Sequence, residues 1–149
     1  MMKKTSSKII AVLVLGALLL GGLNWYNQSK LQKGSKQIQI VVSIDENGTN
    51  KVIYDKTTRT DALKLGDLLD ELVTAKKLLI DLSGNKTDAY GRFILGIEDY
   101  KVTDMAKGPW WLYNSTTNPD CVAAGYCAGI DMAPIYDKDI FTFTFTSTY

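Results

Sequence analysis

Apolar and polar residues alternate from Gln37 to Ile44, the pattern of a strand with one buried face. The next four residues, Asp45 to Gly48, contain Asn-Gly, a strong signal for a tight hairpin turn. Lys51–Tyr54 is apolar enough to form the returning strand. The sequence therefore predicts a β-hairpin whose first strand buries Ile38, Ile40, Val42 and Ile44.

The pattern then changes to a helical one. Leucines and a valine recur one turn apart and predict an amphipathic helix of about three turns that ends at Lys76-Lys77. Lysines at that position would suit the negative end of the helix dipole. The acidic residues Asp67, Asp70 and Glu71 are expected to form the solvated face. The apolar stripe comprises Leu65, Leu68, Leu69, Leu72 and Val73.

The remaining elements are predicted strands. Leu78–Leu82 is a short apolar run, Tyr90–Ile97 has a glycine near each end, and Trp110–Tyr113 follows Gly108-Pro109. In Ile140–Thr146 three phenylalanines alternate with three threonines, so the phenylalanines are expected in the core. Strands around a single helix predict an α+β fold, with one helix packed on a mixed sheet.

The N-terminal segment predicts export. Three lysines precede an apolar run from Ile9 to Leu23, and Trp25-Tyr26 follows where interfacial aromatics would lie. The sequence leaves open whether this is an uncleaved signal anchor or a cleaved signal peptide. In both cases the rest of the chain would lie outside the cytoplasm, as a single-pass membrane protein or a secreted one. We predict a signal helix at residues 1–26, a polar linker at 27–36 and one domain at 37–149.

Composition narrows the function classes. The 149 residues include no histidine, which excludes Ser-His-Asp and Cys-His catalysis and removes the commonest transition-metal ligand. No carboxylate pair forms a recognisable catalytic motif, and no Gly-rich phosphate loop is present. A net charge of +1 gives no basic face for nucleic acid. We predict a protein that is not an enzyme, has no metal site and does not bind nucleic acid.

The two cysteines, Cys121 and Cys127, lie six residues apart. In an oxidising compartment such a pair closes a local loop. The chain-entropy model gives about 2 kcal/mol of stabilisation for so short a loop. The disulfide would either shape a binding loop or act only as a local staple.

Four segments, in this order, resemble the transcobalamin-like C-terminal domain family (DUF4430). The resemblance covers Ile38–Tyr149 and implies a β-grasp ligand-binding module. In the transcobalamin and intrinsic-factor proteins this domain closes over a corrinoid held against a separate helical domain, which the resemblance does not cover. The cysteine loop departs from the family pattern. The segments are LGDLLDEL at Leu65–Leu72, YGRFILGI at Tyr90–Ile97, GPWWLYNS at Gly108–Ser115 and AGIDMAPIYDKDIFTFTFT at Ala128–Thr146.

Aromatic residues supply the candidate site. Trp110 and Trp111 are neighbours in a predicted strand and point to opposite faces, with Tyr113 on the face of Trp111. They could form an exposed platform for a flat ligand, or one could lie in the core and the other under the helix or the cysteine loop. Tyr90 and Gly91 are expected to mark a strand entry with a close backbone approach, and a ligand-facing Tyr90 is the alternative. The candidate ligand-binding residues are Tyr90, Trp111, Tyr113, Tyr126 and Gly129.

These features predict a membrane-tethered or secreted extracytoplasmic ligand-binding module. The resemblance implies a corrinoid such as cobalamin as the ligand for uptake. The expected partner is a transporter or another cell-surface protein. The alternative is a cell-surface protein-interaction or cell-wall module with no small-molecule ligand. An enzyme acting on an extracellular polymer is the least favoured class.

Overall fold

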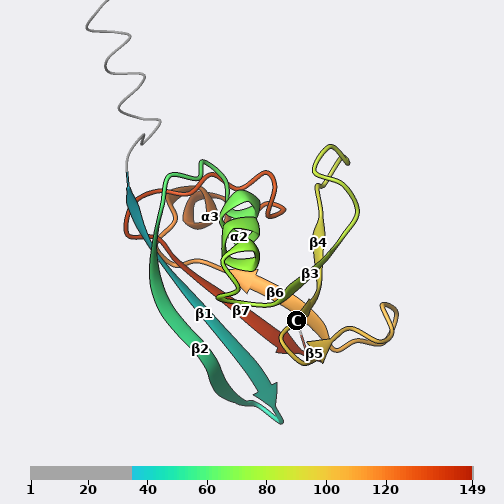
Figure 1. Ribbon diagram of the computed structural model, residues 1–149. Helices are drawn as coiled ribbons and strands as arrows, with labels where there is room; N and C mark the ends of the chain where they lie inside the picture. Colours follow the sequence, from blue (N-terminus) through green and yellow to red (C-terminus); the bar gives the residue numbers. More distant parts are fainter. Residues whose placement is uncertain (1–34, 149) are drawn as a thin grey trace, which may run out of the picture. The chain divides into compact units, whose positions relative to one another are not determined.

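A four-stranded sheet in the order β2-β1-β7-β6 forms the centre of the computed structural model, which describes residues 35–148 (Figure 1). The predicted α+β class is confirmed: the described residues form a mixed sheet, a smaller three-stranded sheet and two helices. The strands of the larger sheet are β1 (Lys36–Glu46), β2 (Thr49–Thr60), β6 (Trp110–Asn114) and β7 (Ile140–Thr146).

The hairpin β1–β2 forms as predicted, with both strands longer than expected. Asn47 and Gly48 both have positive φ, and the Asp45 carboxylate accepts the Gly48 N–H at 2.8 Å. The returning strand extends to Thr60 because its polar residues lie on the exposed edge of the sheet.

The two central strands are parallel. β1 pairs with β7 so that Ile40 is opposite Phe141 and Val42 is opposite Phe143. The apolar side chains of both strands therefore share one face, which is the core face, and the predicted phenylalanine row is buried. The hydroxyl residues of β7 lie on the other face.

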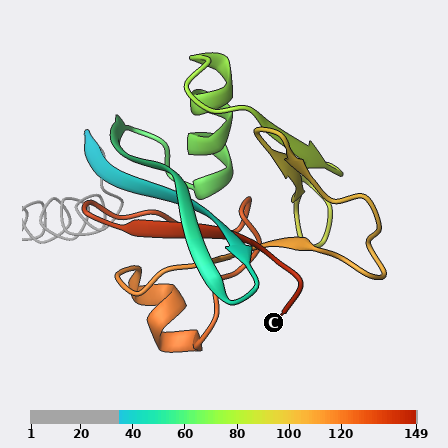
Figure 2. The same cartoon turned by 90° about the horizontal axis from the view of Figure 1, so that it is seen from below.

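Helix α2 (Leu65–Thr74) covers the core face of the sheet, as Figure 2 shows in edge-on view. Its predicted stripe is buried apart from Val73, which packs at the margin. The helix ends before Lys76, so the expected placement of Lys76-Lys77 in its last turn is wrong. Its first backbone N–H groups, from Leu65 and Gly66, donate to carbonyls of Ala133 and Ile130.

The acidic residues of α2 lie at the surface, as expected, and also make side-chain contacts that the sequence pattern did not predict. Asp70 pairs with Arg92 and Lys86, and Asp67 pairs with Lys86. Glu71 accepts a hydrogen bond from the Thr60 hydroxyl at 2.6 Å. The face thus connects α2 to β2 and to the chain around β4.

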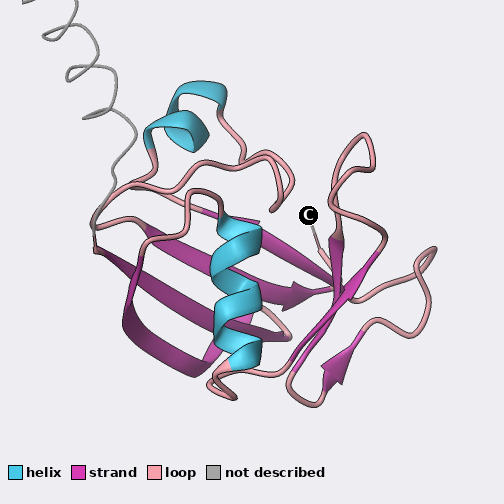
Figure 3. Cartoon of the chain, turned by 45° about the horizontal axis from the view of Figure 1, so that its top comes forward, coloured by secondary structure: helices cyan, strands magenta, loops and turns pink. Residues whose placement is uncertain are grey.

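The smaller sheet has the order β3-β4-β5, formed by Ile80–Ser83, Phe93–Ile97 and Tyr100–Lys101. The predicted strand Tyr90–Ile97 begins later than expected, because Gly91 has φ +69° and Arg92 is held by side-chain contacts. Figure 3 shows this sheet beside the larger one, at the end where β6 lies.

A second helix, α3 (Pro119–Ala124), corrects the expectation of a single helix. Asn118 caps it by accepting the N–H groups of Asp120 and Cys121, Pro119 starts it, and Gly125 ends it with φ +80°. The helix lies across the sheet from α2 (Figure 2). Its signals are present in the sequence, but the helix is short and lacks an apolar stripe.

The described residues belong to one compact unit with one core. None of its helices has the length and hydropathy to cross a membrane. The predicted signal helix at residues 1–26 lies outside the described residues, as does nearly all of the predicted linker at 27–36.

Candidate functional site

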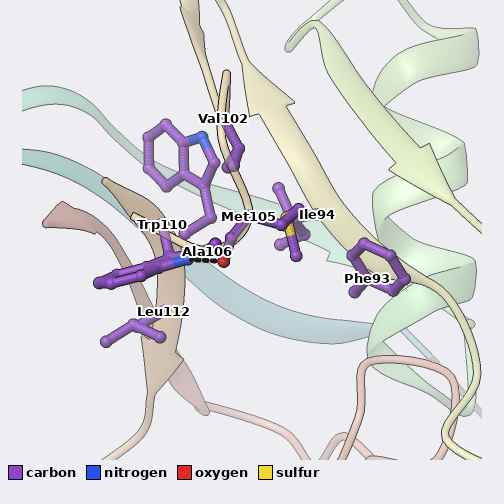
Figure 4. A pocket seen from close by; sticks show the side chains of 8 residues that line it. Phe93, Ile94, Val102, Met105, Ala106, Trp110 and Leu112 are labelled. Carbon is purple, nitrogen blue, oxygen red and sulfur yellow. Dashed lines mark hydrogen bonds between the residues drawn. The ribbon is translucent and has the colours of Figure 1, made fainter. Parts of the chain in front are cut away.

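A mostly apolar groove separates the start of β4 from β6, with a cavity volume of about 480 Å³. Figure 4 shows Phe93 and Ile94 on the β4 side, with Trp110 and Leu112 on the β6 side. The loop between β5 and β6 supplies the remaining wall. We call this surface the apolar groove; its lining residues are Phe93, Ile94, Val102, Met105, Ala106, Trp110, Trp111 and Leu112.

Trp110 is half-buried and is oriented by the loop that precedes it. Its indole Nε1 donates to the Met105 carbonyl at 2.9 Å. Gly108 has φ +68°, and a Cβ there would lie 2.7 Å from the indole ring. Only glycine therefore allows both the backbone conformation and the ring position. The peptide bond between Gly108 and Pro109 is cis.

The groove exposes large apolar side chains to water. Phe93 is 48% exposed and Met105 is 55% exposed, and Leu112 is exposed as well. No charged side chain lines the groove. Burying this surface against an apolar ligand would be favourable by about 25 cal/mol per Å². The adaptable thioether of Met105 and the fixed indole of Trp110 suit a flat organic group.

The β4 side of the groove is held by a charge network. The Arg92 guanidinium donates to both carboxylate oxygens of Asp131, with Nε–Oδ2 at 2.9 Å and Nη2–Oδ1 at 2.8 Å. It also donates to both oxygens of Asp70, at 2.9 and 3.1 Å. Two bidentate contacts define the guanidinium plane. They fix the residue that immediately precedes Phe93.

The pKa values of Asp131 and Asp70 are both lowered by that network. Hydrogen bonds from Arg92 hold the pKa of Asp131 below its ordinary value, against the effect of burial. Burial would raise the pKa of Asp70, but hydrogen bonds from Arg92 and Lys86 outweigh it, so this pKa is also lowered. Gly66 makes room for the network, because a Cβ there would lie 2.0 Å from Asp131 Oδ1.

The structure places Trp111 and Tyr113 on the core face of β6. Trp111 is 8% exposed, lies 5.0 Å from the Phe145 ring centroid and donates from Nε1 to the Tyr100 carbonyl at 2.9 Å. Tyr113 stacks on Phe143 with ring centroids 5.4 Å apart. Its burial raises the pKa of the Tyr113 hydroxyl, which donates to the Ala128 carbonyl.

Tyr113 and Tyr126 meet at a second hollow of about 760 Å³. It lies between the cysteine loop and the face of the sheet that points away from α2. Cys121 and Cys127 form the predicted disulfide, with Cα atoms 4.4 Å apart. We call this surface the threonine hollow; its lining residues are Leu112, Tyr113, Asn114, Gly125, Tyr126, Cys127, Thr142, Thr144 and Thr146.

The two remaining candidates, Tyr90 and Gly129, lie against each other through their backbones. A Cβ on Gly129 would lie 2.3 Å from the Tyr90 carbonyl oxygen, so this close approach requires glycine. The Tyr90 side chain is 87% exposed and lines neither the apolar groove nor the threonine hollow. Of the five candidates, Trp111 is buried and borders the apolar groove, and Tyr113 and Tyr126 line the threonine hollow. Tyr90 and Gly129 meet at one surface turn.

Only some of the site residues that sequence reasoning missed could have been predicted from a local pattern. Adjacent tryptophans in a strand must face opposite ways, so a buried Trp111 implies an outward Trp110. Phe93 and Met105 carried no signal, because isolated apolar residues occur on most protein surfaces. Arg92 and Asp131 lie 39 residues apart, and only the fold brings them together.

No protein-family model matches the chain, and no curated protein matches it significantly. Among solved structures, the chain is similar to a provisionally assigned metal-binding protein from Ruminococcus gnavus. The TM-score is 0.53 and the sequence identity is 25%. The match covers 76% of this chain and 99% of the other.

Proposed function

We propose that this protein is an extracytoplasmic binding module that holds a flat, apolar part of a small organic ligand in the apolar groove. The groove itself carries the proposal: it exposes Phe93 and Met105 beside an indole held in place by its own loop. Its volume of about 480 Å³ lies within the usual range for small-molecule sites, about 300–1,000 Å³. The N-terminal segment would export the domain and either tether it to the membrane or be cleaved.

The fold supports a β-grasp assignment. A helix covers one face of a mixed sheet whose two central strands, β1 and β7, are parallel and come from opposite ends of the domain. This arrangement agrees with the resemblance to the transcobalamin-like family. On that basis we propose a corrinoid as the specific ligand, with part of its macrocycle in the groove and the rest against a partner such as a transporter component.

An organic ligand fits these residues better than a metal ion does, although the Ruminococcus gnavus protein is assigned to metal binding. Within residues 35–148 no three His, Cys, Asp or Glu side chains are grouped to hold a metal. Asp67, Asp70 and Asp131 are held in ion pairs with Arg92 and Lys86. Their oxygens therefore already have cationic partners.

Calorimetric titration of the Ser35–Tyr149 fragment tests the proposal, because this fragment holds every described element and the whole described core. The probes are hydroxocobalamin, cobinamide and the fluorescent apolar anion 8-anilinonaphthalene-1-sulfonate. We expect micromolar binding, weakened at least about tenfold by Trp110→Ala, which corresponds to about 1.4 kcal/mol. Trp110→Phe should retain most of it.

Tyr90→Ala is the matched control, since it removes an exposed aromatic outside the groove. Unfolding curves of each variant establish that it is folded. Binding of the fluorescent probe without either corrinoid would reject the corrinoid and keep the groove as a site. Failure of all three probes to bind, or equal binding to Trp110→Ala, would reject the proposed function.

A further inference from the structure

The threonine hollow lies on the outward face of β6 and β7, under the disulfide-closed loop. It adjoins the apolar groove at Leu112, which lines both. Its other lining residues are different, and so is its chemistry. The apolar groove offers large hydrocarbon surfaces, whereas this hollow offers an aromatic ring, a carboxamide and a set of hydroxyls.

Several contacts constrain the conformation of the loop above the hollow. The cap from Asn118 fixes the start of α3, the Cys121–Cys127 disulfide closes its end, and Gly125 turns the chain. On the far side, the Tyr113 hydroxyl donates to Ala128. Between these anchors Tyr126 remains 69% exposed and lines the hollow. An exposed aromatic on a fixed loop is a common feature of binding sites.

The floor of the hollow supplies polar groups in a regular array. Thr142 and Thr144 are two residues apart on β7, so their side chains point the same way. The Thr144 hydroxyl shares a 3.1 Å hydrogen bond with Ser43, which limits its rotation. Asn114, opposite Thr142 on β6, adds a carboxamide that can both donate and accept.

None of the nine lining residues carries a charge. This excludes the usual recognition of phosphate, carboxylate or ammonium groups, which relies on an opposite charge. A sugar ring matches what is present: its C–H face can stack on Tyr126, and its hydroxyls can exchange hydrogen bonds with hydroxyl and amide groups. We propose that the threonine hollow binds a neutral sugar unit of an extracellular glycan.

This site goes beyond the proposed function: it shares the proposed extracytoplasmic location but does not depend on the apolar groove. An ¹⁵N-labelled Ser35–Tyr149 fragment is titrated with maltotriose, cellotriose and triacetylchitotriose while amide chemical shifts are recorded. At least one sugar should shift the amides of Gly125–Cys127 and Thr142–Thr146, with a Kd of roughly 1 mM. Tyr126→Ala should weaken binding at least about tenfold, and Tyr126→Phe should preserve it.

Two controls separate this proposal from the apolar groove. Trp110→Ala should leave sugar binding unchanged, and Tyr126→Ala should leave binding of the apolar probe unchanged. Tyr90→Ala, which removes an exposed tyrosine elsewhere, should affect neither. The proposal is overturned if none of the three sugars shifts these amides at roughly 10 mM. It is also overturned if Tyr126→Ala binds as tightly as the wild type.

Discussion

Strand β6 places Trp111 and Tyr113 on one face of the sheet, and Trp110, Leu112 and Asn114 on the other. The inward pair packs on Phe145 and Phe143. The outward residues line the apolar groove and the threonine hollow, and the inward pair borders them as well, Trp111 at the groove and Tyr113 at the hollow. Two tryptophans that are adjacent in sequence thus differ in what surrounds them, because one faces the phenylalanine row and the other faces solvent.

The environment of an aromatic residue in a strand is set by its register with the neighbouring strand. The register of β6 with β7 puts Trp111 opposite Phe145 and Tyr113 opposite Phe143. A shift of one residue would turn Trp110 and Leu112 inward and expose Trp111. The two faces of β6 can be tested separately, since each predicts a different response to substitution.

The largest effect should come from the inward face. Trp111→Ala removes a buried indole that also donates to Tyr100, so the free energy of unfolding should fall by about 3 to 5 kcal/mol. Trp110→Ala should lower it by only about 1 kcal/mol, because that ring is half-exposed. Guanidinium unfolding of the Ser35–Tyr149 fragment measures both. Equal losses would mean that the two faces of β6 do not differ as described.

The second largest effect on stability should come from the charge network beside the apolar groove. Asp131→Asn removes the buried charge that faces Arg92 and should lower the free energy of unfolding by about 2 to 3 kcal/mol at neutral pH. The matched control is Asp81→Asn, which breaks the exposed Lys101–Asp81 pair and should cost less than about 0.5 kcal/mol. Urea unfolding measures both variants. If they lose the same free energy of unfolding, the Arg92–Asp131 pair stabilises the fold no more than an ordinary surface ion pair does.

The same carboxylates predict the pH dependence. The pKa values of Asp131 and Asp70 are lower in the folded protein than in the unfolded chain. Their stabilisation is therefore complete above the unfolded value of about 3.9, and it is lost as the pH falls through the folded values. When unfolding is followed from pH 7 to pH 2, the free energy of unfolding should fall less steeply with acid in Asp131→Asn than in the wild type. An unchanged slope would mean that these carboxylates do not cause the loss of stability in acid.

Local patterns predicted most of the fold. Alternation located β1 and β7, the leucine stripe located α2, and Asn-Gly located the hairpin turn. The two strands and the helix could be recognised because the spacing of their apolar residues is visible in the sequence. Helix α3 was missed because six residues are too few to show a period, although Asn118, Pro119 and Gly125 mark its ends.

The site was less predictable, for a physical reason. Alternation shows that Trp110 and Trp111 face opposite ways, but it cannot tell which one meets the core without the register of β6 on β7. The Arg92 network joins three separate segments through side chains that each look like ordinary surface charges. Long-range pairing of this kind leaves no local pattern in one sequence.

The last prediction concerns the disulfide, whose removal should distinguish the apolar groove from the threonine hollow on the outward face of β6. The double variant Cys121→Ala/Cys127→Ala should lower the free energy of unfolding by about 2 kcal/mol, because the unfolded chain regains the entropy of a short loop. Sugar binding at the threonine hollow should weaken, since Tyr126 loses its fixed position. Binding of the apolar probe beside Trp110 should not change, because no residue of the loop lines the apolar groove. Calorimetry with both probes measures the difference. Parallel losses at both sites would mean that the outward face responds as one surface, and that the cysteine loop supports the groove as well as the hollow.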